Sequence, residues 1–221
     1  GSITQAGTGT LSLTTSVSTF TGAVSVNAGT LAVTSLANLG NTSGVSINGA
    51  AFKFLGVFDP SPLKIAIGGS GAAFDTNGNA VTLSNPFVAG SAGGLTKKGL
   101  GSLTLAADND YSGGTVVSAG KLLVNAANGG TGSGTVTVQS GAALGGSGKV
   151  AGAVQLSSGA SLEPGDGAGT LTVASLGLAS GTTATFELAG SGAADLVAVT
   201  GAGGLSLDGT AVTLYQAGGT L

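Results

Sequence analysis

The sequence predicts an all-β fold: a parallel β-helix, or β-solenoid, of about ten short rungs that forms one domain over residues 1–221. Three observations predict this fold. The chain carries one passage twice, it is built from short apolar–small–apolar triplets, and it places glycine at fixed offsets after these triplets. Each of these features is typical of stacked repeats rather than of a closed globule.

The repeated passage covers residues 95–124 in a complete copy and residues 3–33 in a degraded copy. The two copies are offset by 92 residues in their first half and by 91 in their second half. One residue was therefore lost or gained in the loop between the halves, where such changes cost least. In an array of such units, each unit buries its apolar face against its neighbours.

The triplets predict short strands, because apolar residues that alternate with small polar ones have the period of two of a half-buried strand. No window shows the apolar stripe of a helix, so we expect no helix longer than one turn. The row expected to point inward consists of Leu11, Leu13, Val24, Val26, Leu103, Leu105, Val117, Leu122, Val136, Val138, Leu156, Leu171 and Val173.

Glycine follows the second apolar residue of several triplets, as in Val26-Asn27-Ala28-Gly29 and Val117-Ser118-Ala119-Gly120. A corner this short needs a positive φ or a close backbone approach, and glycine allows both. Equivalent strands recur after 18 to 22 residues, which is the expected perimeter of one solenoid rung. The alternative is an antiparallel sandwich, but the chain has few Asn-Gly or Asp-Gly hairpin signals and no Trp.

Composition excludes several classes of function. The chain has no Cys, His, Met, Trp or Arg, which excludes imidazole-assisted nucleophiles, structural zinc and disulfides, and we expect no cofactor. A net charge of −3 without arginine argues against nucleic-acid binding. No apolar run approaches the roughly 20 residues that span a membrane. Only 7% of the residues are charged, so we expect the surface to be covered, most simply by copies of the same chain.

Two acidic turns are candidates for a metal or catalytic site, but we predict no catalytic, cofactor or metal site. Asp108 and Asp110 flank Asn109, and Glu163 and Asp166 flank Pro164-Gly165. Either pair could belong to a calcium loop or a carboxylate pair for glycoside hydrolysis. We interpret them instead as turn residues that bind their own backbone.

Two further segments received a structural interpretation. Lys97-Lys98 is expected to lie on a solvated corner. The rhythm of the strands breaks in an irregular region, residues 52–90, which holds five of the seven Phe residues. We expect a loop over the solenoid flank with Phe52 and Phe54 packed inside. The other interpretation is a lateral contact surface. Its members would be Phe58, Pro60, Pro62 and Phe87.

Residues 94–105, 109–114 and 117–122 resemble the autotransporter-associated β-strand repeat, which occurs in passenger regions of bacterial surface proteins. Residues 74–83 and 162–173, and residues 186–188 together with 195–199, are similar to segments that accompany this repeat, and residues 3–33 resemble it more weakly. The resemblance implies a right-handed parallel β-helix exported to the cell surface or secreted. The chain lacks the C-terminal barrel of the full plan, so we expect a passenger segment or a stand-alone protein that reuses the repeat.

We expect a non-catalytic structural subunit of an extracellular filament, fibre or surface layer, associated end to end as a homo-oligomer or homopolymer. The end rungs that would make this contact contain Leu11, Leu13, Leu205, Leu207, Val212 and Leu214. The alternative is a passenger stalk or adhesin segment of a larger protein, for which a glycan or another cell-surface ligand is left open as a partner. A polysaccharide-cleaving enzyme is disfavoured, because the chain is poor in the carboxylates and cations of such clefts.

Overall fold

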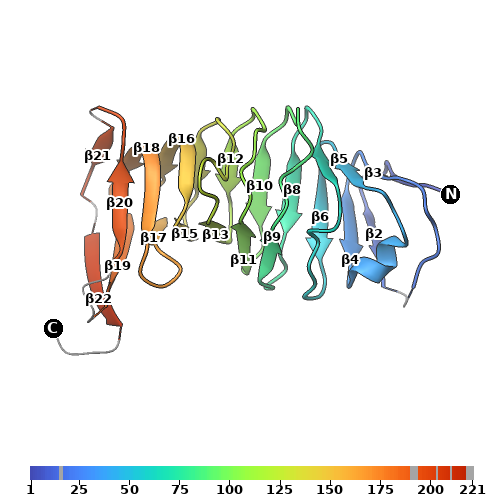
Figure 1. The fold of residues 1–221 in the computed structure, drawn as a ribbon, viewed down its shortest axis with the longest axis horizontal. Coiled ribbons are helices and arrows are strands. Elements are labelled where there is room, and N and C mark those ends of the chain that lie inside the picture. The colour runs from blue at the N-terminus through green and yellow to red at the C-terminus, as the bar shows by residue number, and fades with distance from the viewer. Residues whose placement is uncertain (15–16, 190–193, 203, 210, 218–221) are drawn as a thin grey trace.

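The structure, a computed structural model, describes residues 1–14, 17–189, 194–202, 204–209 and 211–217. Its strands lie side by side along an elongated rod, with the N-terminal strands at one end and the C-terminal strands at the other (Figure 1). All the strand pairs of its three sheets are parallel. This arrangement confirms the predicted solenoid and rules out the antiparallel sandwich.

One sheet runs the length of the rod, and the other two each cover part of it. The first sheet contains β1 (Ile3–Gln5), β3 (Val24–Val26), β5 (Val45–Ile47) and β7 (Ile65–Ile67). The second, long sheet contains β2 (Thr10–Leu13), β4 (Thr30–Val33), β6 (Ala50–Phe54), β8 (Ala72–Asp75), β10 (Leu95–Lys98), β12 (Thr115–Val117), β14 (Val136–Val138), β16 (Lys149–Leu156), β18 (Thr170–Leu178) and β20 (Leu196–Val199), with β21 (Leu205–Leu207) also paired to β18. The third contains β9 (Val81–Leu83), β11 (Ser102–Leu105), β13 (Gly120–Val124), β15 (Ala142–Gly146), β17 (Ser161–Pro164), β19 (Thr183–Ala189) and β22 (Ala211–Ala217).

The register of the strands agrees with the perimeter predicted from the sequence. Val117 lies beside Val138, and Val138 lies beside Leu156, so successive rungs are 21 and 18 residues long. Leu156 in turn lies beside Leu178, 22 residues further along the chain. Ten strands follow one another in the long sheet, which gives about nine turns, close to the ten expected.

The core is a column of aliphatic side chains between the sheets. Of the predicted inward row, every member from Val24 to Val173 is buried, and Leu11 and Leu13 are half-buried and pack against the same core. The only helix among the described residues is the single 3₁₀ turn η1 (Leu36–Leu39), as the absence of an apolar helical stripe predicted.

The corner glycines adopt the conformation that their spacing predicts. Gly29 and Gly120, at equivalent positions of the two repeat copies, have φ values of +63° and +65°. A Cβ atom on Gly120 would clash with the carbonyl oxygens of Gly99 and Gly101 on the preceding rung. Only glycine therefore fits this corner, for both of the reasons given by the sequence.

The two repeat copies use different faces of the rod, which the sequence did not predict. The first copy starts in the first sheet with β1 and continues in the long sheet with β2, whereas the second starts in the long sheet with β10 and continues in the third with β11. The change occurs in the rung of β7, β8 and β9, which contributes a strand to all three sheets. The repeat is thus displaced by one face between its copies.

The expectation of a loop over residues 52–90 is wrong, because these residues contain the end of β6 and all of β7, β8 and β9, but Phe52 and Phe54 pack inside as expected. Phe52 and Phe54 are buried with ring centroids 5.0 Å apart, and Phe54 lies 6.5 Å from Phe74 on the next rung. Phe87 continues this row, with its ring 5.7 Å from Phe74 and 5.8 Å from Tyr111. The aromatic rings therefore form a ladder across the rungs on either side of the change of faces.

Candidate functional site on the corners and faces of the solenoid

The predicted end-rung residues differ in exposure. Leu205 and Leu207 of β21 are 54% and 57% exposed, whereas Leu11 and Leu13 of β2 are half-buried. The backbones of Val212 and Leu214 pair with β19, but their side chains lie outside the described residues. An apolar surface therefore exists at the C-terminal end, and self-association through it stays a prediction.

Two of the four residues of the predicted lateral contact are buried. Phe87 is 5% exposed and belongs to the core, and Pro60 is buried, so neither side chain offers a contact surface. Phe58 is half-buried with its ring 5.4 Å from that of Phe54, and Pro62 is exposed. Contact with a neighbouring molecule therefore stays a prediction for Phe58 and Pro62 alone.

Asp108, Glu163 and Asp166 bind residues of other rungs, so the interpretation that they bind the backbone of their own turn is wrong for these three. Asp108 accepts hydrogen bonds from the side chain and backbone of Asn128 and from the Gly129 N–H, and these bonds, that of the Asn128 side chain first, hold its pKa below the usual value. Glu163 forms an ion pair with Lys121, and Asp166 accepts a hydrogen bond of 3.3 Å from Asn125. The described residues contain no group of three or more His, Cys, Asp or Glu side chains that could hold a metal ion.

The expectation of a solvated corner at Lys97-Lys98 is wrong for Lys97. Its side chain is 0% exposed, because it points into the rod like Leu95 two residues earlier, whereas Lys98 points outward. In the two neighbouring strands, Phe74 and Val117 occupy the same inward position. The alternation along β10 indicates an inward position for residue 97, whereas the residue type, lysine, suggests exposure to solvent.

The buried ammonium group is surrounded by backbone oxygens. Lys97 Nζ donates hydrogen bonds of 2.9, 2.7 and 3.1 Å to the carbonyl oxygens of Lys98, Gly99 and Ala119. Burial lowers the pKa of the amine to about 8, an effect that the charge of nearby Asp75 opposes. Asp75 forms its ion pair with Lys53, at a distance of 3.2 Å, and acts on Lys97 only through its charge.

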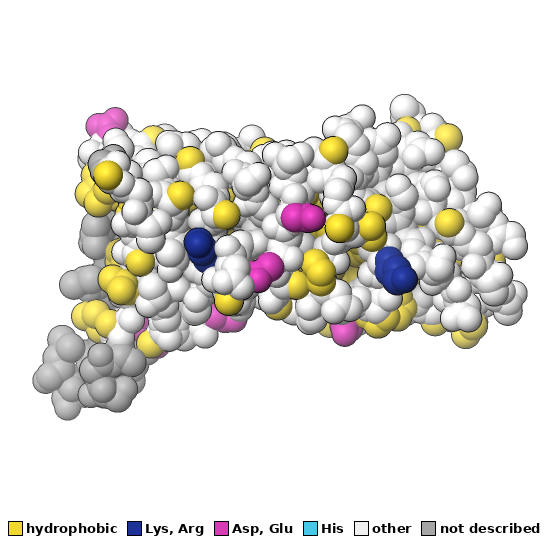
Figure 2. All heavy atoms as spheres, turned by 45° about the horizontal axis from the view of Figure 1, so that its top comes forward, with side chains coloured by type: hydrophobic (Ala, Val, Ile, Leu, Met, Phe, Trp, Pro, Cys, Tyr) yellow, Lys and Arg dark blue, Asp and Glu magenta, His cyan; other side chains and the backbone are white. Residues whose placement is uncertain are grey.

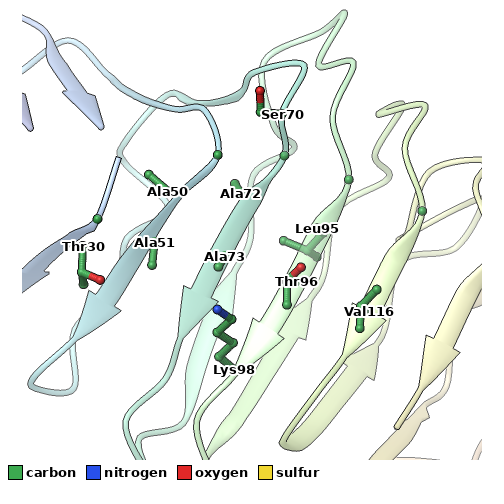
Figure 3. Close-up of a pocket in the computed structure, with 15 residues that line it drawn as sticks. Thr30, Ala50, Ala51, Ser70, Ala72, Ala73, Leu95, Thr96, Lys98 and Val116 are labelled. Carbon is green, nitrogen blue, oxygen red and sulfur yellow. The ribbon is translucent and has the colours of Figure 1, made fainter. Parts of the chain in front are cut away.

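A shallow groove of about 510 Å³ lies on the outer face of the long sheet. Thr30, Ala51, Ala73, Thr96 and Val116 follow one another in register along its floor, and small side chains leave the surface hollow (Figure 3). Figure 2 shows one face of the molecule, on which the charged side chains are few and well separated. Such a surface offers hydroxyl groups and flat apolar area rather than a strong electrostatic field.

The proteins to which this chain is similar agree with this geometry. The model of the passenger-associated-transport-repeat family matches residues 3–33 and 95–124, the two copies found in the sequence. Two segments of the chain are therefore similar to passenger-associated-transport repeats. These repeats contain β1 to β4 and β10 to β13, so each repeat spans four strands and two corners of the solenoid.

A curated relative of the chain is the Adhesin BmaC autotransporter of Brucella suis biovar 1 (strain 1330). It is 34% identical over 123 residues, which cover 51% of this chain and 4% of that protein. The chain thus spans about 4% of the length of this relative. No solved structure matches the chain. The repeat and the relative together place the chain at the cell surface or outside the cell, as the resemblance implied.

The described residues contain no helix that is both long enough and apolar enough to cross a membrane.

Proposed function

We propose that the chain is a non-catalytic stalk segment within the passenger of a bacterial surface adhesin. The observation that carries this proposal is the match to an adhesin autotransporter of which the chain covers 4%, together with the two passenger repeats. These findings support the alternative interpretation of the sequence, a passenger segment, over the subunit of a self-assembling filament.

The geometry supports a spacer role. Parallel rungs stack with a spacing of about 4.8 Å, so each turn of roughly 20 residues lengthens the rod by that amount without altering its cross-section. Leu205 and Leu207 are exposed in β21, where a further rung of a longer chain would cover them. In a passenger, the apolar end surface would thus be buried by the same chain instead of by another copy.

The proposal is tested in the full-length surface protein. One variant lacks the segment, and a second carries in its place an unrelated β-solenoid with the same number of rungs. Surface display is measured by antibody labelling of intact cells, and adhesion by counting attached bacteria. A stalk predicts that both variants are displayed, that the deletion weakens adhesion, and that the replacement restores it.

A binding role for the segment predicts a different result, because the replacement would then fail to restore adhesion. In that case the purified chain should be tested on immobilised glycans, since a glycan or other cell-surface ligand is the partner that the sequence left open. Ordered filaments of the purified chain at micromolar concentration would instead favour a filament subunit over a stalk segment.

A further inference from the structure

The buried Lys97 has a counterpart in the other repeat. The offset of 92 residues places Gln5 at the position of Lys97 and Gly7 at the position of Gly99. Gln5 Nε2 donates a hydrogen bond of 2.8 Å to the carbonyl oxygen of Gly7, and Lys97 Nζ donates one of 2.7 Å to that of Gly99. Two different side chains therefore make the same contact at equivalent corners.

The backbone around this contact is also the same in both copies. Asn27 N–H donates to the Gln5 carbonyl oxygen at 2.8 Å, and Ser118 N–H donates to the Lys97 carbonyl oxygen at 2.9 Å. The residue is thus bound on both sides: its carbonyl oxygen accepts from the next rung, while its side chain donates to the turn that follows it. In the second copy the side chain also reaches the next rung at Ala119.

We propose that the third position of each repeat, occupied by Gln5 and Lys97, is a corner latch. The side-chain nitrogen at this position binds the carbonyl oxygen of the glycine two residues later and so fixes the turn that leads into the next strand. Carbonyl oxygens at a corner point away from the sheet ladders and therefore need a donor from elsewhere; Gly7 is exposed and Gly99 is half-buried. A side-chain donor at a fixed position therefore specifies the corner as the glycine does.

The latch at Lys97 differs from that at Gln5 because it carries a buried charge. From β8, Asp75 is the charged group nearby, and its carboxylate also binds Lys53. β12 and the corner at 118–120 contribute no charged residue, and Lys121 of β13 is directed to Glu163. The ammonium is thus held mainly by backbone carbonyl oxygens, and it is burial that lowers its pKa to about 8.

The chain itself supplies the test, because Gln is the natural latch of the other copy. Lys97→Gln keeps a donor at the corner and removes the charge, whereas Lys97→Met keeps the length of the side chain and removes both. We expect Lys97→Met to melt at least about 4 °C below Lys97→Gln at pH 7. Lys98→Gln and Lys98→Met, which alter the exposed neighbour, should melt at the same temperature. Equal melting temperatures for the two Lys97 variants would overturn the latch.

A second measurement does not depend on the variants folding. The amine resonances of Lys97 and Lys98 can be followed by NMR as the pH of the wild-type protein is raised from 6 to 11. A latched Lys97 loses its proton near pH 8, well below the ordinary lysine value of 10.5, and exchanges its amine protons more slowly than Lys98. If Lys97 titrates at the ordinary value and its amine protons exchange as fast as those of Lys98, Lys97 is solvated and holds no corner.

Discussion

At the scale of single residues, the corners between strands are where side-chain chemistry decides the path of the chain. Gly120 fits because it has no Cβ atom to clash with the rung below, and Lys97 fits because its amine finds three carbonyl oxygens. The two residues act on one corner, since Gly99 offers its carbonyl oxygen to Lys97 and lies against Gly120. Substitutions here should therefore cost more than substitutions on the strands' outer faces.

The lowered pKa of Lys97 predicts that the protein becomes more stable in mild alkali. With a pKa of about 8 in the folded state and 10.5 as the ordinary value, the unfolded chain binds more protons between these pH values. The free energy of unfolding should then rise with pH in this window, by at most about 3 kcal/mol from this group. Burial raises the pKa of Tyr111, so the stability that this group contributes to the folded state is lost as the pH rises above about 10.

Chemical denaturation of the wild type at pH 7 and pH 9.5 checks this prediction, with Lys97→Gln as the control that lacks the amine. The wild type should gain stability relative to the control over this interval. A constant difference between the two proteins would show that Lys97 titrates like a solvated lysine.

A second prediction concerns two corner glycines with nearly the same φ. Gly120→Ala forces a Cβ atom against the Gly99 and Gly101 carbonyl oxygens, whereas Gly141, with a φ of +77°, has no atom within 4 Å of the added carbon. We expect Gly141→Ala to lose about 1 kcal/mol from the unfavourable φ alone. Gly120→Ala should lose clearly more, as measured by urea denaturation. Equal losses would mean that the rungs can move apart at little cost.

At the scale of the element, the strand is the unit that burial stabilises. Leu105 of β11 is fully buried and lies in register between Leu83 of β9 and Val124 of β13. Leu105→Asp would place an unpaired charge within this column, which costs several kcal/mol and should unfold the adjacent rungs. Thr104→Asp, on the outer side of the same strand, is the matched control.

The expected result is a large drop in the denaturation midpoint for Leu105→Asp and almost none for Thr104→Asp. Hydrogen exchange should then show that protection is lost first in β9, β11 and β13. A midpoint for Leu105→Asp close to that of the wild type would contradict the assigned register.

Most elements could be predicted because each depends on neighbours in sequence. The alternation of Val136 and Val138 with a polar residue predicts a strand. The glycine three residues after Val117 predicts a corner, and the spacing of equivalent strands predicts the length of the rung. The displacement of the repeat by one face could not be predicted, because it depends on which loops leave the ladder around β7, β8 and β9. The prediction for Lys97 was wrong because lysine is usually solvated, whereas the position of Lys97 in the strand indicates the core.

At the scale of the whole molecule, the outer groove of the rod is lined by uncharged residues and Lys98. Each rung stacks on the next in the same way, so the same architecture can be extended in either direction. The sequence indicated an extracellular solenoid but did not distinguish a filament subunit from a passenger segment. The relative favours the passenger segment, because the matching region is a small part of its much longer chain.

Surface labelling followed by sizing of the labelled protein tests the central claim most directly. Intact bacteria are treated with a reagent that cannot enter cells, and the labelled protein is detected with an antibody against this chain. A passenger segment predicts a labelled polypeptide many times longer than 221 residues. Detection only after the cells are broken open, or a labelled chain of 221 residues assembled into fibres, would contradict the account.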